Sequence, residues 1–118
     1  MDERKFRRIP FEAEIQLAVD DRAWSCRLLD IALKGALLEA PQTLPLSLGT
    51  RGNLSLPLTG SEVTLDFTAE LVHREGARLG FRFLQENLET LTHLRTLLEL
   101  NSGDPDGIRS ELLTWLKN

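Results

Sequence analysis

Residues that build metal centres, disulfides and nucleophilic active sites are scarce in this chain of 118 residues. The single cysteine, Cys26, rules out an internal disulfide, and its alternation with Trp24 and Leu28 predicts a buried, inert thiol. The two histidines, His73 and His93, stand too far apart in sequence to give a clustered metal-ligand spacing. No paired carboxylates or Ser–His–Asp set is visible either. The sequence therefore argues against an enzyme and predicts no metal and no cofactor.

Long apolar runs are also absent. No stretch approaches the ~18 uninterrupted apolar residues of a membrane span, so no span is expected. The N-terminus carries cations with no apolar segment behind them, because Phe11 opens an alternating pattern, and this differs from a secretory signal. A composition of 42% hydrophobic and 27% charged residues is ordinary for a soluble globular protein. The length fits one domain, and we expect it to be cytoplasmic.

Positive charge is in the minority, with 14 Lys and Arg against 18 Asp and Glu and a net charge of -4. This balance argues against general nucleic-acid binding, which needs a basic domain or face, so no DNA or RNA partner is expected. Positive charge is nevertheless concentrated at one place, because four cations stand in the five residues Arg4-Lys5-Phe6-Arg7-Arg8. Any anion that the protein binds is therefore expected at this N-terminal cluster.

Apolar and polar residues alternate with a period of two along much of the chain, which is typical of half-buried strands. The turn Asp20-Asp21 separates two alternating segments and predicts a hairpin. The alternating segments are 11–19, 24–28, 54–58, 63–71 and 79–83, and residues 36–39 are a further short strand that ends at Pro41. Six short strands separated by turn residues predict a small antiparallel barrel or sandwich.

The period changes to that of a helix after Gln85. Leucines follow at helical spacing, at positions 88, 91, 94 and 98 with Leu97 beside them, and Gly103 is a typical C-terminal stop. Asp104-Pro105 is a typical helix start, and the apolar residues after it are Ile108, Leu112, Trp115 and Leu116. The sequence therefore predicts a mainly β fold, a six-stranded antiparallel β-barrel with one or two C-terminal helices.

The two arginines Arg4 and Arg8 precede the first predicted strand. Guanidinium groups make bidentate hydrogen bonds to phosphate and to the O6/N7 edge of guanine, and they stack on the guanine ring. Taken alone, a basic N-terminal segment is most simply a solvated chain end. Its value as a signal depends on what stands beside it.

The second motif is Asp30-Ile31-Ala32-Leu33-Lys34-Gly35, at the end of a predicted strand. A carboxylate at Asp30 matches the N1–H and amino edge of guanine, and the small Ala32 leaves room for a base or ribose. Gly35 would permit a turn with positive φ or the close approach of a ligand to the backbone. Asp and Gly also populate ordinary turns, so only the combination with the arginines is specific.

Together these residues resemble the PilZ domain, the bacterial receptor module for cyclic diguanylate (c-di-GMP). The signature of that family is Arg-x-x-x-Arg before the first strand and (Asp/Asn)-x-Ser-x-x-Gly at the end of the second. Here the two motifs are Arg4 to Arg8 and Asp30 to Gly35, and Leu79-Gly80-Phe81-Arg82-Phe83 is similar to the Gly-Phe sixth strand of the family. The resemblance covers essentially the whole chain and is closest to short, stand-alone PilZ proteins.

The resemblance implies a single PilZ-like domain over 1–118, with a flexible basic arm at 1–10, a barrel at 11–84 and C-terminal helices at 86–117. It also implies a receptor without catalysis that binds c-di-GMP, often as an intercalated dimer. On binding, the arm would become ordered and alter the interaction with a downstream protein. The implied ligand residues are Arg4, Lys5, Arg8, Asp30, Ala32 and Gly35, with lesser contacts from Arg7, His73 and Arg74.

One position departs from the family pattern, because Ala32 stands where the family usually has serine. The lost hydroxyl removes a hydrogen bond of ~1.5–3 kcal/mol to a charged group, or one to two decades in affinity. A PilZ-fold interaction module with weak or no nucleotide binding is therefore the main alternative. A barrel that binds single-stranded nucleic acid is a third reading, and the acidic balance and the lack of aromatics among the cations weigh against it.

Overall fold

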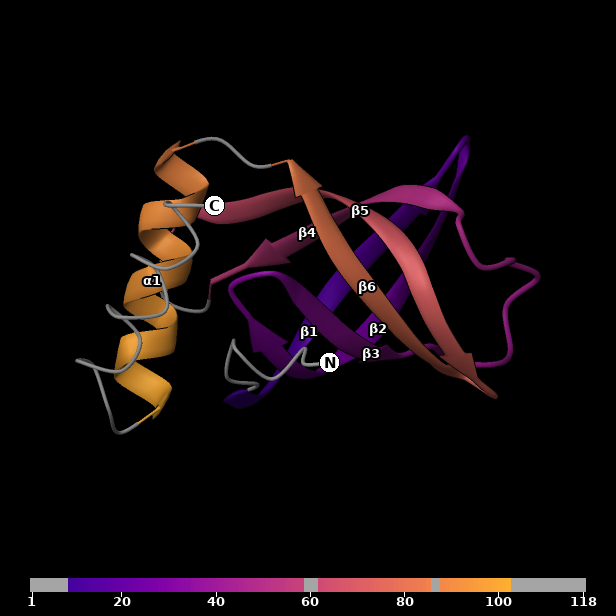
Figure 1. Ribbon diagram of the computed structural model, residues 1–118, viewed down its shortest axis with the longest axis horizontal. Helices are drawn as coiled ribbons and strands as arrows, with labels where there is room; N and C mark the ends of the chain where they lie inside the picture. The colour runs from indigo at the N-terminus through magenta and orange to yellow at the C-terminus, as the bar shows by residue number, and fades with distance from the viewer. Residues whose placement is uncertain (1–8, 59–61, 86–87, 103–118) are drawn as a thin grey trace.

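The computed structural model of the protein describes residues 9–58, 62–85 and 88–102. The basic cluster at 4–8 and the second predicted helix at 105–116 lie outside these residues. Among the described residues, one helix follows six strands (Figure 1). The elements are β1 (Ile9–Val19), β2 (Arg22–Ala32), β3 (Gly35–Glu39), β4 (Arg51–Pro57), β5 (Thr64–Glu75), β6 (Arg78–Gln85) and α1 (Leu88–Ser102).

The strands form a closed barrel in the order β1-β2-β3-β6-β5-β4, and every neighbouring pair is antiparallel. β1 closes the barrel on β4 through a short register from Gln16–Ser55 to Ala18–Asn53. This confirms the predicted six-stranded antiparallel barrel. A closed sheet pairs strands at both sides and so removes the open edges of a sandwich.

The β1–β2 hairpin forms at the predicted turn, with Val19 opposite Arg22 across Asp20-Asp21. Asp20 has a φ of 58°, a left-handed conformation that Asp tolerates better than most residues. β1 and β2 each begin two residues before their predicted starts, at Ile9 and Arg22. Backbone pairing extends past the apolar alternation, and the alternation alone could not reveal it.

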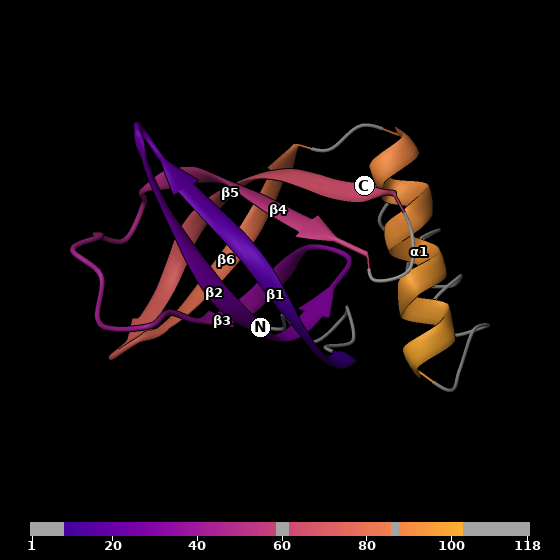
Figure 2. The ribbon, with the colours of Figure 1, turned by 180° about the vertical axis from the view of Figure 1, so that it is seen from behind.

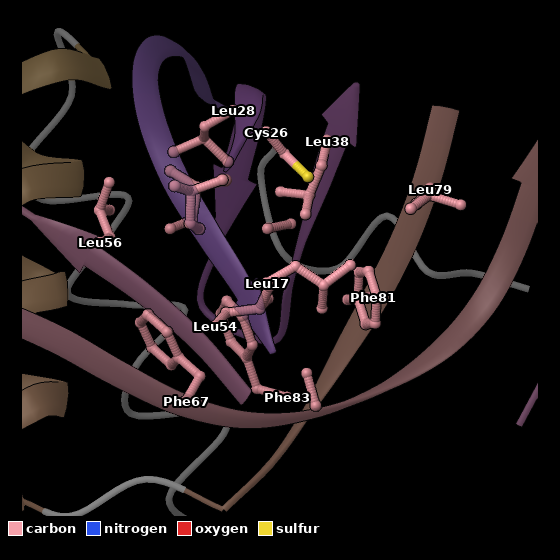
Figure 3. Packing of buried hydrophobic residues seen from close by; sticks show 14 of the residues in the cluster. Leu17, Cys26, Leu28, Leu38, Leu54, Leu56, Phe67, Leu79, Phe81 and Phe83 are labelled. Carbon is pink, nitrogen blue, oxygen red and sulfur yellow. The ribbon is translucent and has the colours of Figure 1, made fainter. Parts of the chain in front are cut away.

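The inward-facing side chains fill the barrel with one apolar core (Figure 3). Leu17, Leu28 and Leu54 are fully buried, each on a different strand. The rings of Phe67 and Phe83 stack with centroids 4.1 Å apart and an angle of 10° between their planes. Because a fully buried side chain of this kind stabilises a protein by ~1.5–3 kcal/mol, this interior supplies the main stabilisation of the fold.

The helix α1 lies across one end of the barrel, where it contacts β1 and β5 (Figure 2). Leu91, Leu94, Leu97 and Leu98 are buried in the same core as the barrel residues, whereas Leu100 is 79% exposed. The predicted leucine stripe is therefore confirmed, and α1 ends at Ser102, directly before the predicted stop at Gly103. Within residues 9–58, 62–85 and 88–102, no helix is long and apolar enough to cross a membrane.

Candidate functional site

The corner between β2 and β3 carries the second sequence motif. β2 ends at Ala32, β3 begins at Gly35, and these two residues are paired across a two-residue turn. In that turn Leu33 is fully buried, and the carbonyl oxygen of Lys34 accepts a hydrogen bond of 2.8 Å from the amide of Phe83. The corner is therefore held against β6 by both a buried side chain and a backbone hydrogen bond.

Gly35 is required at this corner by the close approach of β6. A Cβ on Gly35 would stand 2.3 Å from the carbonyl oxygen of Phe81, which no side chain tolerates. The expectation of a positive φ at Gly35 is wrong, because among the described glycines only Gly49 and Gly76 have one. Glycine therefore serves here to bring two strands together, rather than to make a left-handed turn.

Asp30 lies on the outer face of the barrel, in a row of residues that are opposite one another on four adjacent strands. The neighbouring Ile31 and Ala36 face the core, so Asp30 and its partner Leu37 face outward. The row, which we call the Asp30 row, consists of Asp30 on β2, Leu37 on β3, Gly80 on β6 and His73 on β5. At a spacing of ~4.8 Å between strands it extends over ~14 Å.

The packing of Gly80 against His73 shows that both belong to this face. A Cβ on Gly80 would lie 3.1 Å from the Cβ of His73, so the histidine stands directly beside the bare glycine backbone. The side chain of His73 is 62% exposed, and its Nε2 lies 3.9 Å from Oε1 of Glu75. An exposed aromatic ring at the end of the Asp30 row offers a surface on which a base can stack.

Beside the Asp30 row runs a second row, which we call the Arg82 row. It consists of Ala32 on β2, Gly35 on β3, Arg82 on β6 and Glu70 on β5. Nη2 of Arg82 lies 2.8 Å from Oε1 of Glu70, with the two side chains 56% and 23% exposed. Ala32 is only 5% exposed, although it does not belong to the apolar core.

On its other side the Asp30 row is flanked by Arg27, Glu39 and Arg78, which are opposite one another on β2, β3 and β6. Nη2 of Arg27 lies 2.5 Å from Oε1 of Glu39. Arginines thus stand on both sides of the row that contains Asp30, Gly80 and His73. This arrangement suits a ligand that combines flat rings with more than one negative charge.

Of the remaining predicted residues, the structure describes only Arg74. Arg74 is opposite the inward-facing Leu79 and donates a hydrogen bond to the carbonyl oxygen of Leu46, away from the Asp30 row. Arg4, Lys5, Arg7 and Arg8 lie outside the described residues. Arg82 was not among the predicted site residues, although the spacing Gly80-Phe81-Arg82 on an alternating strand predicts an outward cation two residues from a bare backbone.

Cys26 is 3% exposed inside the barrel, and burial raises the pKa of its thiol to about 11. The thiol is therefore protonated at neutral pH and is not a nucleophile, which agrees with the inert thiol that its alternation predicted. Across the described part of the chain, no three His, Cys, Asp or Glu side chains come together in a way that would hold a metal ion.

A closed six-stranded antiparallel barrel with this motif corner between its second and third strands is the architecture of a PilZ domain. The pattern of the PilZ domain matches residues 2–100 of this chain, which therefore belongs to the PilZ domain family.

Several solved structures are similar in fold, among them these three. The PilZ domain of YcgR from Escherichia coli, solved with c-di-GMP, gives a TM-score of 0.74 at 20% identity, covering 87% of this chain and 94% of that one. YcgR from Escherichia coli in complex with c-di-GMP gives 0.70 at 19% identity, covering 95% of this chain and 51% of that one. The PilZ domain of CeSA from a cellulose-synthesizing bacterium gives 0.62 at 21% identity, covering 82% and 96%.

Proposed function

We propose that the protein is a non-enzymatic receptor for c-di-GMP, which it binds on the outer face formed by β2, β3, β6 and β5. The observation that carries the proposal is the register at the start of β1, where Ile9 is opposite Ile31 and Pro10 is opposite Asp30. The basic cluster Arg4 to Arg8 is therefore joined by a peptide bond to the strand that begins beside the Asp30 corner. The described chain therefore begins beside the corner that carries the second half of the family motif.

Each group of the site has a chemical counterpart in the ligand. The ligand has two guanines and two phosphodiesters, and Arg4 and Arg8 bind phosphates and guanine faces, with Lys5 and Arg7 adding positive charge. Asp30 accepts hydrogen bonds from a guanine edge, and His73 contacts a base at the far end of its row. Each charge-assisted hydrogen bond contributes ~1.5–3 kcal/mol, so a few of them reach the ~8 kcal/mol of micromolar affinity after ordering costs.

Binding is relayed by the arm. In this proposal the part of the arm before β1, residues 1–8, becomes ordered over the ligand, and the new surface alters the affinity for a downstream protein in the cytoplasm. The relatives support the ligand, since YcgR is solved with c-di-GMP on the same fold. No catalysis and no cofactor enter the mechanism, because occupancy alone is the signal.

Titration calorimetry with c-di-GMP tests the proposal. We expect micromolar binding by the wild-type protein and a loss of at least about tenfold in Arg4→Ala, Arg8→Ala and Asp30→Ala, because each removes a charged partner of the ligand. Asp66→Ala is the matched control, since Asp66 is another outward carboxylate whose Oδ1 accepts a hydrogen bond of 2.7 Å from Ser55 on the far side of the barrel. Absence of heat at high micromolar ligand, with folded protein, removes the proposal.

The alternative is a PilZ-fold interaction module that binds little or no nucleotide. Ala32 favours it, because this position offers no hydroxyl to a ligand. Two exposed apolar side chains favour it as well, Leu48 at 63% and Val72 at 47% exposure, on segments joined by the hydrogen bond from the Gly49 amide to the Leu71 carbonyl. A melting temperature that does not move with c-di-GMP would decide for this alternative.

A further inference from the structure

Arg82 lies in the same row as Ala32, the position that lacks a hydroxyl donor. Arg82 on β6 is opposite Gly35 on β3, and Gly35 is opposite Ala32 on β2. No side chain therefore stands between Arg82 and Ala32 in this row. No larger residue can fill that place, because a Cβ on Gly35 would meet the carbonyl oxygen of Phe81 at 2.3 Å. Between Arg82 and Ala32 the row therefore carries only the backbone of Gly35, and Ala32 at its end is 5% exposed.

The present partner of Arg82 is one that it can exchange. The pair between Arg82 and Glu70 is 2.8 Å long, but the arginine side chain is 56% exposed. Ion pairs at exposed positions contribute little to stability, because water screens both charges. A phosphodiester held in a less hydrated site offers the same guanidinium a bidentate, charge-assisted contact, which is stronger.

Glu70 is not left without a cation when Arg82 moves. Arg51 on β4 is directly opposite Glu70, on the side away from Arg82. Arg51 is exposed, and it makes no ion pair with any residue in the described part of the barrel. Opposite charges on directly paired residues of adjacent strands attract each other, so Arg51 can take over Glu70 as Arg82 leaves.

From this arrangement we infer that Arg82 is a ligand residue of the proposed c-di-GMP site, held by Glu70 until the nucleotide arrives. On binding, Arg82 turns across Gly35 and donates to a phosphate oxygen beside Ala32, and it supplies the donor that alanine cannot. Glu70 then pairs with Arg51. The inference rests on the proposed function and adds a residue that neither half of the family motif contains.

Calorimetry on single variants gives the first test. Arg82→Ala is expected to weaken c-di-GMP binding by about tenfold, the effect of one charge-assisted hydrogen bond. Glu70→Gln is expected to tighten it by about two- to fivefold, because the competing carboxylate charge is gone. Arg22→Ala is the control, because it removes one positive charge at the start of β2, ~33 Å along the strand from Ala32 at its end. It is expected to leave the affinity within about twofold of the wild-type value.

A double-mutant cycle with Ala32→Ser gives the second test. If Arg82 replaces the missing hydroxyl, serine at position 32 gains little in the wild-type background. In the Arg82→Ala background it restores about tenfold of affinity, because the phosphate has lost its other donor. An equal gain in both backgrounds would show that the two positions act independently and would overturn the inference.

The outcomes distinguish a failure of the proposed c-di-GMP binding from a failure of the role inferred for Arg82. If the wild-type protein binds c-di-GMP and Arg82→Ala binds equally well, this inference is wrong and the proposed function stands. If the folded wild-type protein gives no heat, the proposed function fails, and the inference fails with it. Unfolding midpoints of the variants are measured alongside, and little change is expected, because Arg82 and Glu70 lie outside the core.

Discussion

The inner and outer faces of the same strands use their residues in different ways. On β5 the inward positions are Leu65, Phe67, Ala69 and Leu71, all buried, and the outward positions between them are Asp66, Thr68 and Glu70. Inward residues contribute through volume and burial, so another apolar residue of similar size serves nearly as well. Outward residues contribute through register, because Glu70 is useful only opposite Arg82 and Arg51. One strand thus carries the stability of the fold and the chemistry of the site on alternate residues.

Phe67→Ala should show the largest effect of the inner face. Phe67 is 1% exposed and stacks on Phe83, so truncation is expected to cost ~3–5 kcal/mol of unfolding free energy. The neighbouring Thr68→Ala is the outward control, and it is expected to stay within ~0.5 kcal/mol. Urea denaturation measures both variants, and similar losses in the two would break the comparison between the faces.

Gly35→Ala should have an intermediate effect on stability, and it should also affect ligand binding on the outer face. Its Cβ would meet the backbone of Phe81, so β3 and β6 must move apart at a cost of ~1–3 kcal/mol. Movement of this corner also shifts Asp30 and Arg82, so c-di-GMP affinity is expected to fall together with stability. Gly80→Ala is the matched control, because its nearest neighbour is a side-chain atom, the His73 Cβ at 3.1 Å. We expect the smaller loss there, and the reverse order would contradict the close-approach explanation.

The Cys26 thiol should have the smallest effect on stability at neutral pH, and its effect at high pH tests whether the barrel interior excludes water. Burial raises its pKa from the ordinary value of 9.0 to about 11, so the folded protein retains a proton that the unfolded chain releases between these values. The thiol therefore leaves stability unchanged below pH 9 and lowers it as the pH rises from 9 to 11. Denaturation across this range measures the slope, with Cys26→Ala as the control. An equal slope in both proteins would show that the thiol does not contribute.

The alternation and the leucine stripe were enough to predict the inner face, because a burial period of 2 or 3.6 is written directly in the sequence. The outer face depends on the register, which is set around the Asp30 row by one bulge in β2 and one in β5. Leu29 on β2 and Val72 on β5 have no partner on β3 and β6 respectively, and each extra residue reverses which side chains face outward after it. The bulge at Val72 turns His73 outward, opposite Gly80, and leaves Arg74 opposite the inward-facing Leu79. Nothing in the local sequence marks either position, so His73 and Arg74 could not be told apart beforehand.

The corner itself was predicted in place, with Asp30 and Ala32 at the end of β2 and Gly35 at the start of β3. The positive φ expected for the glycine was wrong, and the structure shows instead a close contact with β6, far away in sequence. The pairing of β3 with β6 also explains why the sequence did not suggest Arg82 as a candidate ligand residue. Its relation to Ala32 exists only across two strand pairings, neither of which is visible in a linear motif.

The closure of the barrel limits how this protein can meet other molecules. Because β1 pairs with β4 through Gln16 to Ala18 and Asn53 to Ser55, the described strands close into a barrel, and its outer face presents side chains to other molecules. Recognition on this face is therefore made by side chains, and the backbone beneath them stays the same whether a position gains or loses a charge. Substitutions at outward positions can therefore change which ligand the barrel recognises, one residue at a time, while the barrel itself stays the same.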